Sequence, residues 1–173
     1  TTLVSAPLIY FHRHRRSLEA TWKYLLICSV GIAFALLGNF LLAIAVSGQA
    51  PAALSLNALI KLGPSLNQPW LKAAFLFLLV GYGTKMGLAP LHTWLPDAHS
   101  ESPSVISALL SGALLNCAFL GILRSYQICL SAGLGSFCRP LLILFGLVSM
   151  AWAAVFIFGQ TDFKRMLAYS SVE

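Results

Sequence analysis

The chain has 173 residues, of which 58% are hydrophobic and only 9% are charged. Soluble domains carry about 25% charged residues, so this composition excludes an ordinary soluble protein. The net charge of +6 does not indicate nucleic-acid binding, because the basic residues form one small cluster and are otherwise scattered. The apolar residues come in blocks of about 20, the length that crosses a bilayer. An all-α, polytopic transmembrane helix bundle is therefore expected.

The chain opens on a short apolar stretch, residues 3–11, which is too short to span a bilayer. A further apolar segment begins at residue 166. We therefore expect an internal fragment of a larger protein, with partial helices at both ends. Residues 12–16 are basic (HRHRR), and the positive-inside rule predicts that they lie on the cytoplasmic side. The alternative, a lipid-headgroup site, requires more basic residues than this cluster contains.

The first predicted span covers about residues 22–46. Trp22 and Tyr24 stand at its start, where aromatic residues commonly mark the membrane interface. Glu19 and Lys23 are four residues apart, in the order that forms a stabilising pair on a helix. A structural ion pair is therefore the favoured role for Glu19.

The second predicted span, about residues 70–88, carries Lys85 into an apolar run. A lysine at bilayer depth costs about 2.5–3.5 kcal/mol on insertion scales, so it should face a polar or wet interior. The alternative is a lysine that snorkels to the headgroups. An interruption of the helix is predicted between about Gly81 and Pro96. Glycines there let neighbouring backbones approach closely, and prolines prevent a regular helix from continuing. These structural residues are Gly81, Gly83, Gly87, Pro90 and Pro96.

A polar connector, residues 96–103, follows the interruption. Asp97, His99 and Glu101 lie in it, with His92 shortly before, so a metal site or a proton relay could form there. Structural metal sites need three or four ligands at characteristic spacings, and none is recognisable here. A proton-collecting mouth or a solvated loop is the favoured interpretation.

The third predicted span covers about residues 103–123, with Ser102 as N-cap and Pro103 as the first helical residue. Small residues recur with Asn116 on one stripe, which favours close helix packing. Ser111 should lie about 140° from Asn116 on an α-helix, so the two are expected to face different directions.

The fourth predicted span covers about residues 140–158, after a loop at 125–139. Cys129 and Cys138 flank that loop, and either pack as free thiols or form a disulfide if the loop faces an oxidising compartment. The charged residues Asp162, Lys164 and Arg165 lie in the loop that ends this span. Alternating spans place residues 12–16, 96–102 and 164–165 on one face, which the basic residues mark as cytoplasmic.

Three ordered motifs resemble those of one membrane family. Residues 85–99 (KMGLAPLHTWLPDAH), with Pro103 and residues 107–110 after them, are similar to the proton-conducting antiporter-like subunits of respiratory complex I, membrane-bound hydrogenases and multisubunit cation/proton antiporters. Residues 19–24 (EATWKY) and 160–172 (QTDFKRMLAYSSV) match other landmarks of that family. Residues 107–124 are most similar to the large F-type antiporter-like component of nickel–iron hydrogenases of the hydrogenase-four, or formate hydrogenlyase, class.

The resemblance implies a bundle of about fourteen helices that contains broken helices at ion sites. It implies a bacterial or archaeal cytoplasmic membrane and a redox-driven complex, of hydrogenase or NADH:quinone oxidoreductase type, that moves protons. Lys85 matches the family's central lysine, whose charge a nearby carboxylate or burial can switch. The implied relay is Lys85, His92, His99, Asn116 and Ser111, although Asn116 and Ser111 replace titratable groups of relatives.

The same resemblance leaves alternative functions open. This chain carries no Fe–S, flavin, nickel or quinone motif and no metal site, so no cofactor of its own is expected. Redox chemistry would belong to its partners, which are other membrane subunits and a peripheral redox arm, within membrane lipid and without nucleic acid. The alternatives are a non-pumping scaffold that anchors the hydrogenase arm, and a subunit of a multisubunit Na⁺/H⁺ antiporter.

Overall fold

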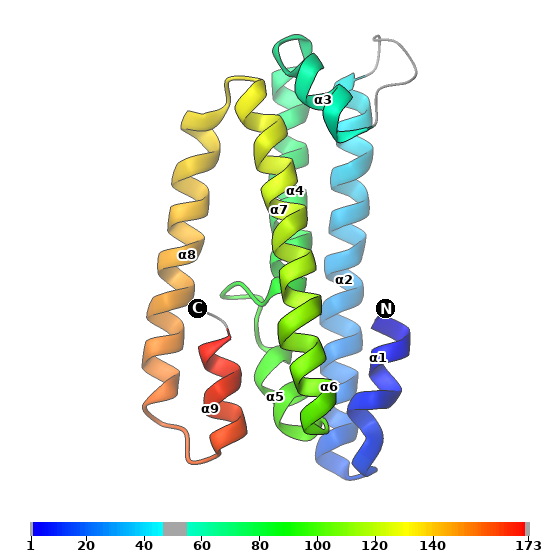
Figure 1. Cartoon of the computed structure of the whole chain (residues 1–173), viewed down its shortest axis with the longest axis vertical. Coiled ribbons are helices and arrows are strands. Elements are labelled where there is room, and N and C mark those ends of the chain that lie inside the picture. The colour runs from blue at the N-terminus through cyan, green and yellow to red at the C-terminus, as the bar shows by residue number, and fades with distance from the viewer. Residues whose placement is uncertain (1, 47–54, 172–173) are drawn as a thin grey trace.

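The computed structural model describes residues 2–46 and 55–171, and every regular element in these ranges is helical (Figure 1). The expected loop residues 47–54 and the terminal residues 1, 172 and 173 lie outside the described residues. In chain order the elements are α1 (Thr2–Ile9), η1 (Tyr10–His12), α2 (Arg15–Val46), α3 (Leu56–Leu62), η2 (Gly63–Ser65), α4 (Gln68–Met86), α5 (Trp94–Glu101), α6 (Ser104–Leu109), η3 (Leu110–Leu115), α7 (Asn116–Ser131), α8 (Gly135–Ile157) and α9 (Phe163–Ser170).

Four long helical segments run side by side along the molecule: α2, α4, the continuous α6–η3–α7 segment, and α8 (Figure 1). Helix α3 crosses one end, and α1, α5 and α9 lie toward the other. Among the described residues, three segments are long and apolar enough to cross a membrane: Arg15–Val46, Ser104–Ser131 and Gly135–Ile157. Helix α4 has 19 residues, but its lysines and glycines make it less apolar. The chain is an integral membrane protein.

Several helices extend past the apolar blocks in the sequence. Helix α2 begins at Arg15, so the basic residues at 15–16 form its first turn instead of a loop. The third segment continues to Ser131, and the expected loop at 125–139 shrinks to residues 132–134. The physical reason is that hydropathy marks where lipid ends, whereas a helix can continue into water with polar side chains.

The expected helix interruption lies between Met86 and Trp94. Gly87 adopts the left-handed conformation (φ 90°), and its N–H donates to the carbonyl of Gly83, which ends α4 in the way that glycine favours. The following Ala89–Pro90 peptide bond is cis, and α5 starts four residues after Pro90. No helix continues through Pro90.

Three of the predicted helix-breaking residues do not break the helix. Gly81 and Gly83 lie inside α4. A Cβ added at Gly81 would lie 2.5 Å from the backbone nitrogen of Ala35 in α2, so this glycine serves close helix packing. Pro96 is the third residue of α5, where a proline is tolerated because first-turn N–H groups have no partner in the helix. The connector predicted at 96–103 is therefore largely the helix α5.

The start of the third segment also differs from the prediction by one residue. Pro103 is the N-cap of α6, and Ser102 is the C-cap of α5. The hydroxyl of Ser102 donates to the carbonyl of His99, 3.4 Å away, instead of capping the next helix. The two helices follow each other so closely here that Ser102 belongs to the end of α5.

The core is divided into two clusters that lie on either side of the interruption. One joins α3, α4, α7 and the end of α2, around Leu71, Phe75 and Leu79. The other joins α1, α5 and the start of α2, around Tyr24 and Trp94. The end of α4 therefore lies where the two packed regions meet.

Residues 12–16, the α5–α6 junction and the α8–α9 connection lie at the same end of the bundle, as predicted (Figure 1). We expect His14→Cys and Glu101→Cys to react with a membrane-impermeant maleimide from the cytoplasmic side. Asn57→Cys, on α3 at the opposite end, should react from the other side. Labelling of oriented vesicles measures this, and the reverse pattern would invert the topology.

Candidate functional site around Lys85

Lys85 lies at the end of α4, directly before the interruption, and is half-buried. Its Nζ donates a hydrogen bond of 3.0 Å to the hydroxyl of Tyr24 on α2. The same nitrogen lies 4.5 Å from the centre of the Tyr24 ring and 5.8 Å from that of Trp94, close enough for cation–π attraction. Within the described residues, Lys85 forms no ion pair with a carboxylate. A neutral aromatic environment therefore holds the ammonium group.

Tyr24 and Trp94 are site residues that the sequence analysis missed. Tyr24 was expected at the membrane interface, but it is completely buried, and its ring lies 5.1 Å from that of Trp94. Trp22, which is 55% exposed, does lie on the outer surface. Trp22 and Tyr24 are two positions apart, so they point about 200° apart on α2. This angular separation was the signal in the sequence that could have placed Tyr24 on the inner side of α2 and Trp22 on the outer side.

Side chains form hydrogen bonds with backbone groups around the interruption. The indole N–H of Trp94 donates to the carbonyl of Thr84, 2.8 Å away, near the end of α4. The N–H of Ala89 donates to the hydroxyl of Ser149 on α8, 2.9 Å away. Lipid offers no hydrogen-bond partners, so a helix break at membrane depth needs such contacts.

His92 and His99 are both buried, with 3% and 4% of their surfaces exposed. His99 Nδ1 lies 2.7 Å from the hydroxyl of Ser107, while its Nε2 has no partner among the described residues. His92 lies against the rings of Trp152 and Tyr169, and its Nδ1 also has no partner there. Buried polar atoms are usually hydrogen-bonded, so both nitrogens are available to water or to a group outside the described part.

Ser111 and Asn116 line one groove, which contradicts the expectation that they face different directions. The reason is η3, a π-helical turn that begins one residue before Ser111 and ends one residue before Asn116. A π-helix bonds residues five apart and so brings them into register, unlike an α-helix. Within the described part of the chain, Asn116 bonds to no neighbouring helix; its amide N–H donates to the carbonyl of Gly112, 2.7 Å away.

Two grooves contain some of these side chains. One, of about 330 Å³, contains Met86, Ser111, Asn116 and Ser171. The other, of about 550 Å³, contains His99, Ser107, Ser111 and Ser171, and the last two hydroxyls lie 3.3 Å apart. A water molecule occupies about 30 Å³ in the liquid, so both grooves have room for several waters. Ser111 and Ser171 line both grooves, so the two grooves adjoin at these hydroxyls.

Asp97 forms two ion pairs instead of lying in a solvated loop. It accepts from Lys23 on α2 and from Arg165 on α9, each at 2.9 Å. Lys23 also pairs with Glu19 at 2.7 Å, as predicted. Asp97 is 22% exposed in its side chain and the cations about twice that. The three helices α2, α5 and α9 are therefore tied together by one carboxylate.

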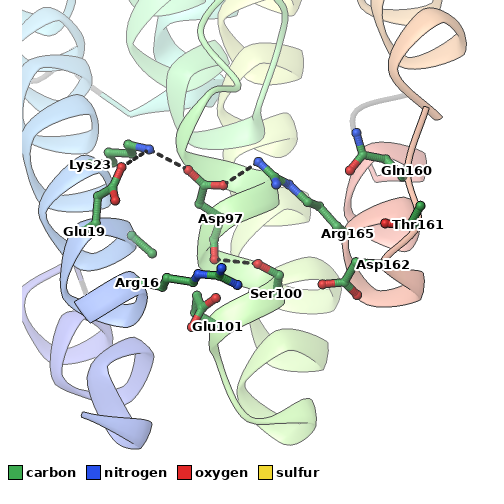
Figure 2. A pocket seen from close by; sticks show the side chains of 11 residues that line it. Arg16, Glu19, Lys23, Asp97, Ser100, Glu101, Gln160, Thr161, Asp162 and Arg165 are labelled. Carbon is green, nitrogen blue, oxygen red and sulfur yellow. Dashed lines mark hydrogen bonds and ion pairs between the residues drawn. The ribbon is translucent and has the colours of Figure 1, made fainter. Parts of the chain in front are cut away.

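These charged residues line a pocket of about 450 Å³ at the end of the bundle that holds the basic cluster (Figure 2). Figure 2 shows Asp97 between Lys23 and Arg165, with Glu101 and Asp162 also facing the pocket. His99 lies on a different side of α5 from Asp97, because the two are two positions apart and so about 200° apart around the helix. The described residues contain no group of three potential metal ligands, so the carboxylates and histidines do not converge.

The other charged residues in the last loop have structural contacts. Asp162 caps α9 by accepting from the N–H of Lys164 at 2.9 Å. The Nζ of Lys164 lies 3.5 Å from the carbonyl of Ser102 and donates to it. Cys129 and Cys138 are both buried and are free thiols, so they pack without forming the disulfide considered above.

The whole chain, residues 1–173, matches the family described as NADH:quinone oxidoreductase/Mrp antiporter, transmembrane. A hydrogenase-4 component F homolog of Methylacidiphilum infernorum is 45% identical over 99% of the chain. An NAD(P)H-quinone oxidoreductase chain 4 of Picosynechococcus is 47% identical over 61% of the chain. The matches cover 37% and 18% of those two relatives, so the chain spans only part of their length.

Solved membrane complexes contain the same fold. A chain of an archaeal membrane-bound sulfane sulfur reductase superposes on 99% of this chain with a TM-score of 0.89 at 24% identity. A chain of respiratory complex I from Thermus thermophilus superposes on 92% with a TM-score of 0.72 at 29% identity. The matched parts are 34% and 33% of those chains.

We expect Asp97→Asn to destabilise the protein, because it leaves Lys23 and Arg165 without their shared carboxylate. The loss should be about 1–2 kcal/mol, since the group is partly buried and bonds two cations. Glu19→Gln is the matched control and should cost less than about 0.5 kcal/mol, because Glu19 is 66% exposed. Thermal unfolding of the purified full-length protein in detergent measures both; equal losses would contradict the bridging role.

Proposed function

Because this chain belongs to the NADH:quinone oxidoreductase/Mrp antiporter transmembrane family, we propose that it is part of a membrane subunit that moves protons in a redox-driven complex. The two curated relatives are named as a hydrogenase component and a quinone oxidoreductase chain, which supports a parent complex of one of these types. The chain itself supplies the ion path. Other membrane subunits and a peripheral redox arm carry out the electron transfer.

The observation that carries this proposal is the environment of Lys85. Its ammonium group is half-buried at a helix break and bonds a neutral hydroxyl instead of a carboxylate. A lysine locked in a buried ion pair keeps its proton, because losing it would strand the partner charge. Lys85 has no such partner in the described residues, so a charge arriving from elsewhere in the complex can change its protonation.

The proposed relay continues through His92, His99, Ser111 and Asn116. The two histidines offer unpartnered nitrogens, and the grooves around Ser111 offer room for water. Serine and asparagine do not titrate, so their role in this relay is to hold water molecules that pass protons. Met86, next to Lys85 in the chain, lines the groove that contains Asn116.

Two other functions make different predictions. A scaffold that anchors the redox arm would not need Lys85, and the non-titrating residues Ser111 and Asn116 favour this alternative. A multisubunit Na⁺/H⁺ antiporter would use the same membrane path without a redox arm, and the name of the matched family includes such antiporters. Ion flux measured with and without the redox reaction distinguishes the three.

We expect Lys85→Met to abolish proton movement while the complex still assembles, because methionine fills similar space without a charge. Lys85→Arg should also fail, since a guanidinium group effectively never gives up its proton. The measurement is proton flux in vesicles reconstituted with the complete complex, recorded beside the redox rate. Normal flux in Lys85→Met would reject the relay and support the scaffold.

We expect Asn116→Leu to slow proton flux by about tenfold or more, if one water position in the groove is lost at a barrier cost of about 1.4 kcal/mol. The substitution is on an exposed side of α7, so folding should be unaffected. Phe119→Leu, which changes an apolar wall of the same groove, is the control. Unchanged flux in Asn116→Leu would show that the residue serves packing alone.

A further inference from the structure

Tyr24 connects Lys85 to the first helix of the chain. Its hydroxyl lies 3.0 Å from the Nζ of Lys85 on α4 and 2.6 Å from the hydroxyl of Ser5 on α1. Ser5 in turn donates to the carbonyl of Thr2, 3.2 Å away. These contacts join α1, α2 and α4, so three helices meet at one phenol oxygen.

The protonation of Lys85 determines the direction of these hydrogen bonds. An ammonium group only donates, so the Tyr24 oxygen must accept from it. The Tyr24 O–H is then left to donate to Ser5, and the Ser5 O–H to the carbonyl of Thr2. A neutral amine can accept, which allows the Tyr24 O–H to turn toward Lys85 instead. The charge of Lys85 therefore decides whether the Tyr24 O–H donates to Ser5 on α1 or to Lys85.

The phenol is held in place by its surroundings. Tyr24 is completely buried, and its ring packs against Trp94, whose own N–H is fixed by the carbonyl of Thr84. Cys28, one turn further along α2, is also completely buried and interacts with Lys85. A tyrosine packed this tightly cannot swing away, so movement at the site falls to the flexible lysine side chain.

We infer that Tyr24 is the positioning residue of Lys85. Its hydroxyl holds the ammonium group beside α2, and the direction of its hydrogen bond with Ser5 on α1 changes with the protonation of Lys85. The inference rests on the proposed function only in treating Lys85 as a group whose charge changes. The hydroxyl bond stabilises the charged lysine more than the neutral one, because a hydrogen bond from a charged group is the stronger of the two. The contacts of Lys85 with the aromatic rings remain when the hydroxyl is removed.

The test is Tyr24→Phe, which removes the hydroxyl and keeps the ring. With ¹⁵N-labelled lysine in the full-length protein, the Lys85 Nζ signal is identified by its absence in Lys85→Met. Its titration midpoint should move about one pH unit lower in Tyr24→Phe, since the charged form loses a hydrogen bond and one unit is a tenfold change in equilibrium. The alkaline limb of the flux profile should move by the same amount.

Tyr126→Phe is the matched control. Its hydroxyl also accepts from a cation, the Nε of Arg139 at 3.3 Å, but at the opposite end of the bundle. This variant should leave both the Lys85 midpoint and the flux profile unchanged. Ser5→Ala should move the Lys85 midpoint in the same direction as Tyr24→Phe but by less, because it removes an acceptor for the Tyr24 O–H.

The possible results separate the inference from the proposed function. An unchanged Lys85 midpoint in a folded Tyr24→Phe protein would overturn the inference, even if Lys85→Met abolishes flux. A shifted midpoint together with normal flux in Lys85→Met would support Tyr24 as the positioning residue and reject the relay. A shift of equal size in Tyr126→Phe would show a general effect on the bundle and would also overturn the inference.

Discussion

A helix that stops inside a membrane leaves backbone groups that lipid cannot satisfy, and the structure around Met86–Trp94 depends on this constraint. The turn at Gly87 returns two N–H groups to the carbonyl of Gly83. Trp94 and Ser149 supply side-chain partners for two more backbone groups, one before the break and one within it. Helices α4, α5 and α8 are therefore fastened to each other around the break. Lys85 is the next-to-last residue of α4 and so lies directly before this break.

The charged groups of the chain are arranged in two different ways. Asp97 bonds two cations at the edge of the bundle, where partial exposure limits the cost of desolvation. Lys85 lies at the end of α4, where aromatic rings and a phenol contact its ammonium group and no carboxylate of the described residues pairs with it. The first arrangement holds charges in place and ties helices together. The second leaves a charge free to respond to a change elsewhere, which is what the proposed function requires.

The two arrangements are also linked through the backbone. Lys23 is next to Tyr24 on α2, and Asp97 is one turn from Trp94 on α5. The ion pair between Lys23 and Asp97 therefore holds together the two helices whose aromatic residues surround Lys85. Close approach of α2 and α4 at Gly81 completes this arrangement, since any larger residue there would meet the backbone at Ala35. The position of the lysine thus depends on contacts beyond its own hydrogen bond and ring contacts.

By itself, the sequence determined the all-helical membrane class, the helix break near Pro90, the pair of Glu19 with Lys23 and the family, because composition, local spacing and motif order are properties of the chain alone. It placed Tyr24 at the interface and Ser111 away from Asn116, and for Asp97 it offered a proton-collecting mouth or a solvated loop without the ion pairs that the structure shows. The first two assignments were wrong, and the ion pairs of Asp97 were missed, for one reason: each depends on which side of a helix meets a neighbour. The π-helical turn at η3 rotates Asn116 into the groove of Ser111, and a rotation of that kind leaves no mark in hydropathy. Only the packing of α2 against α4 and α5 decided that Lys85 bonds a tyrosine, because contacts between distant segments arise from tertiary structure.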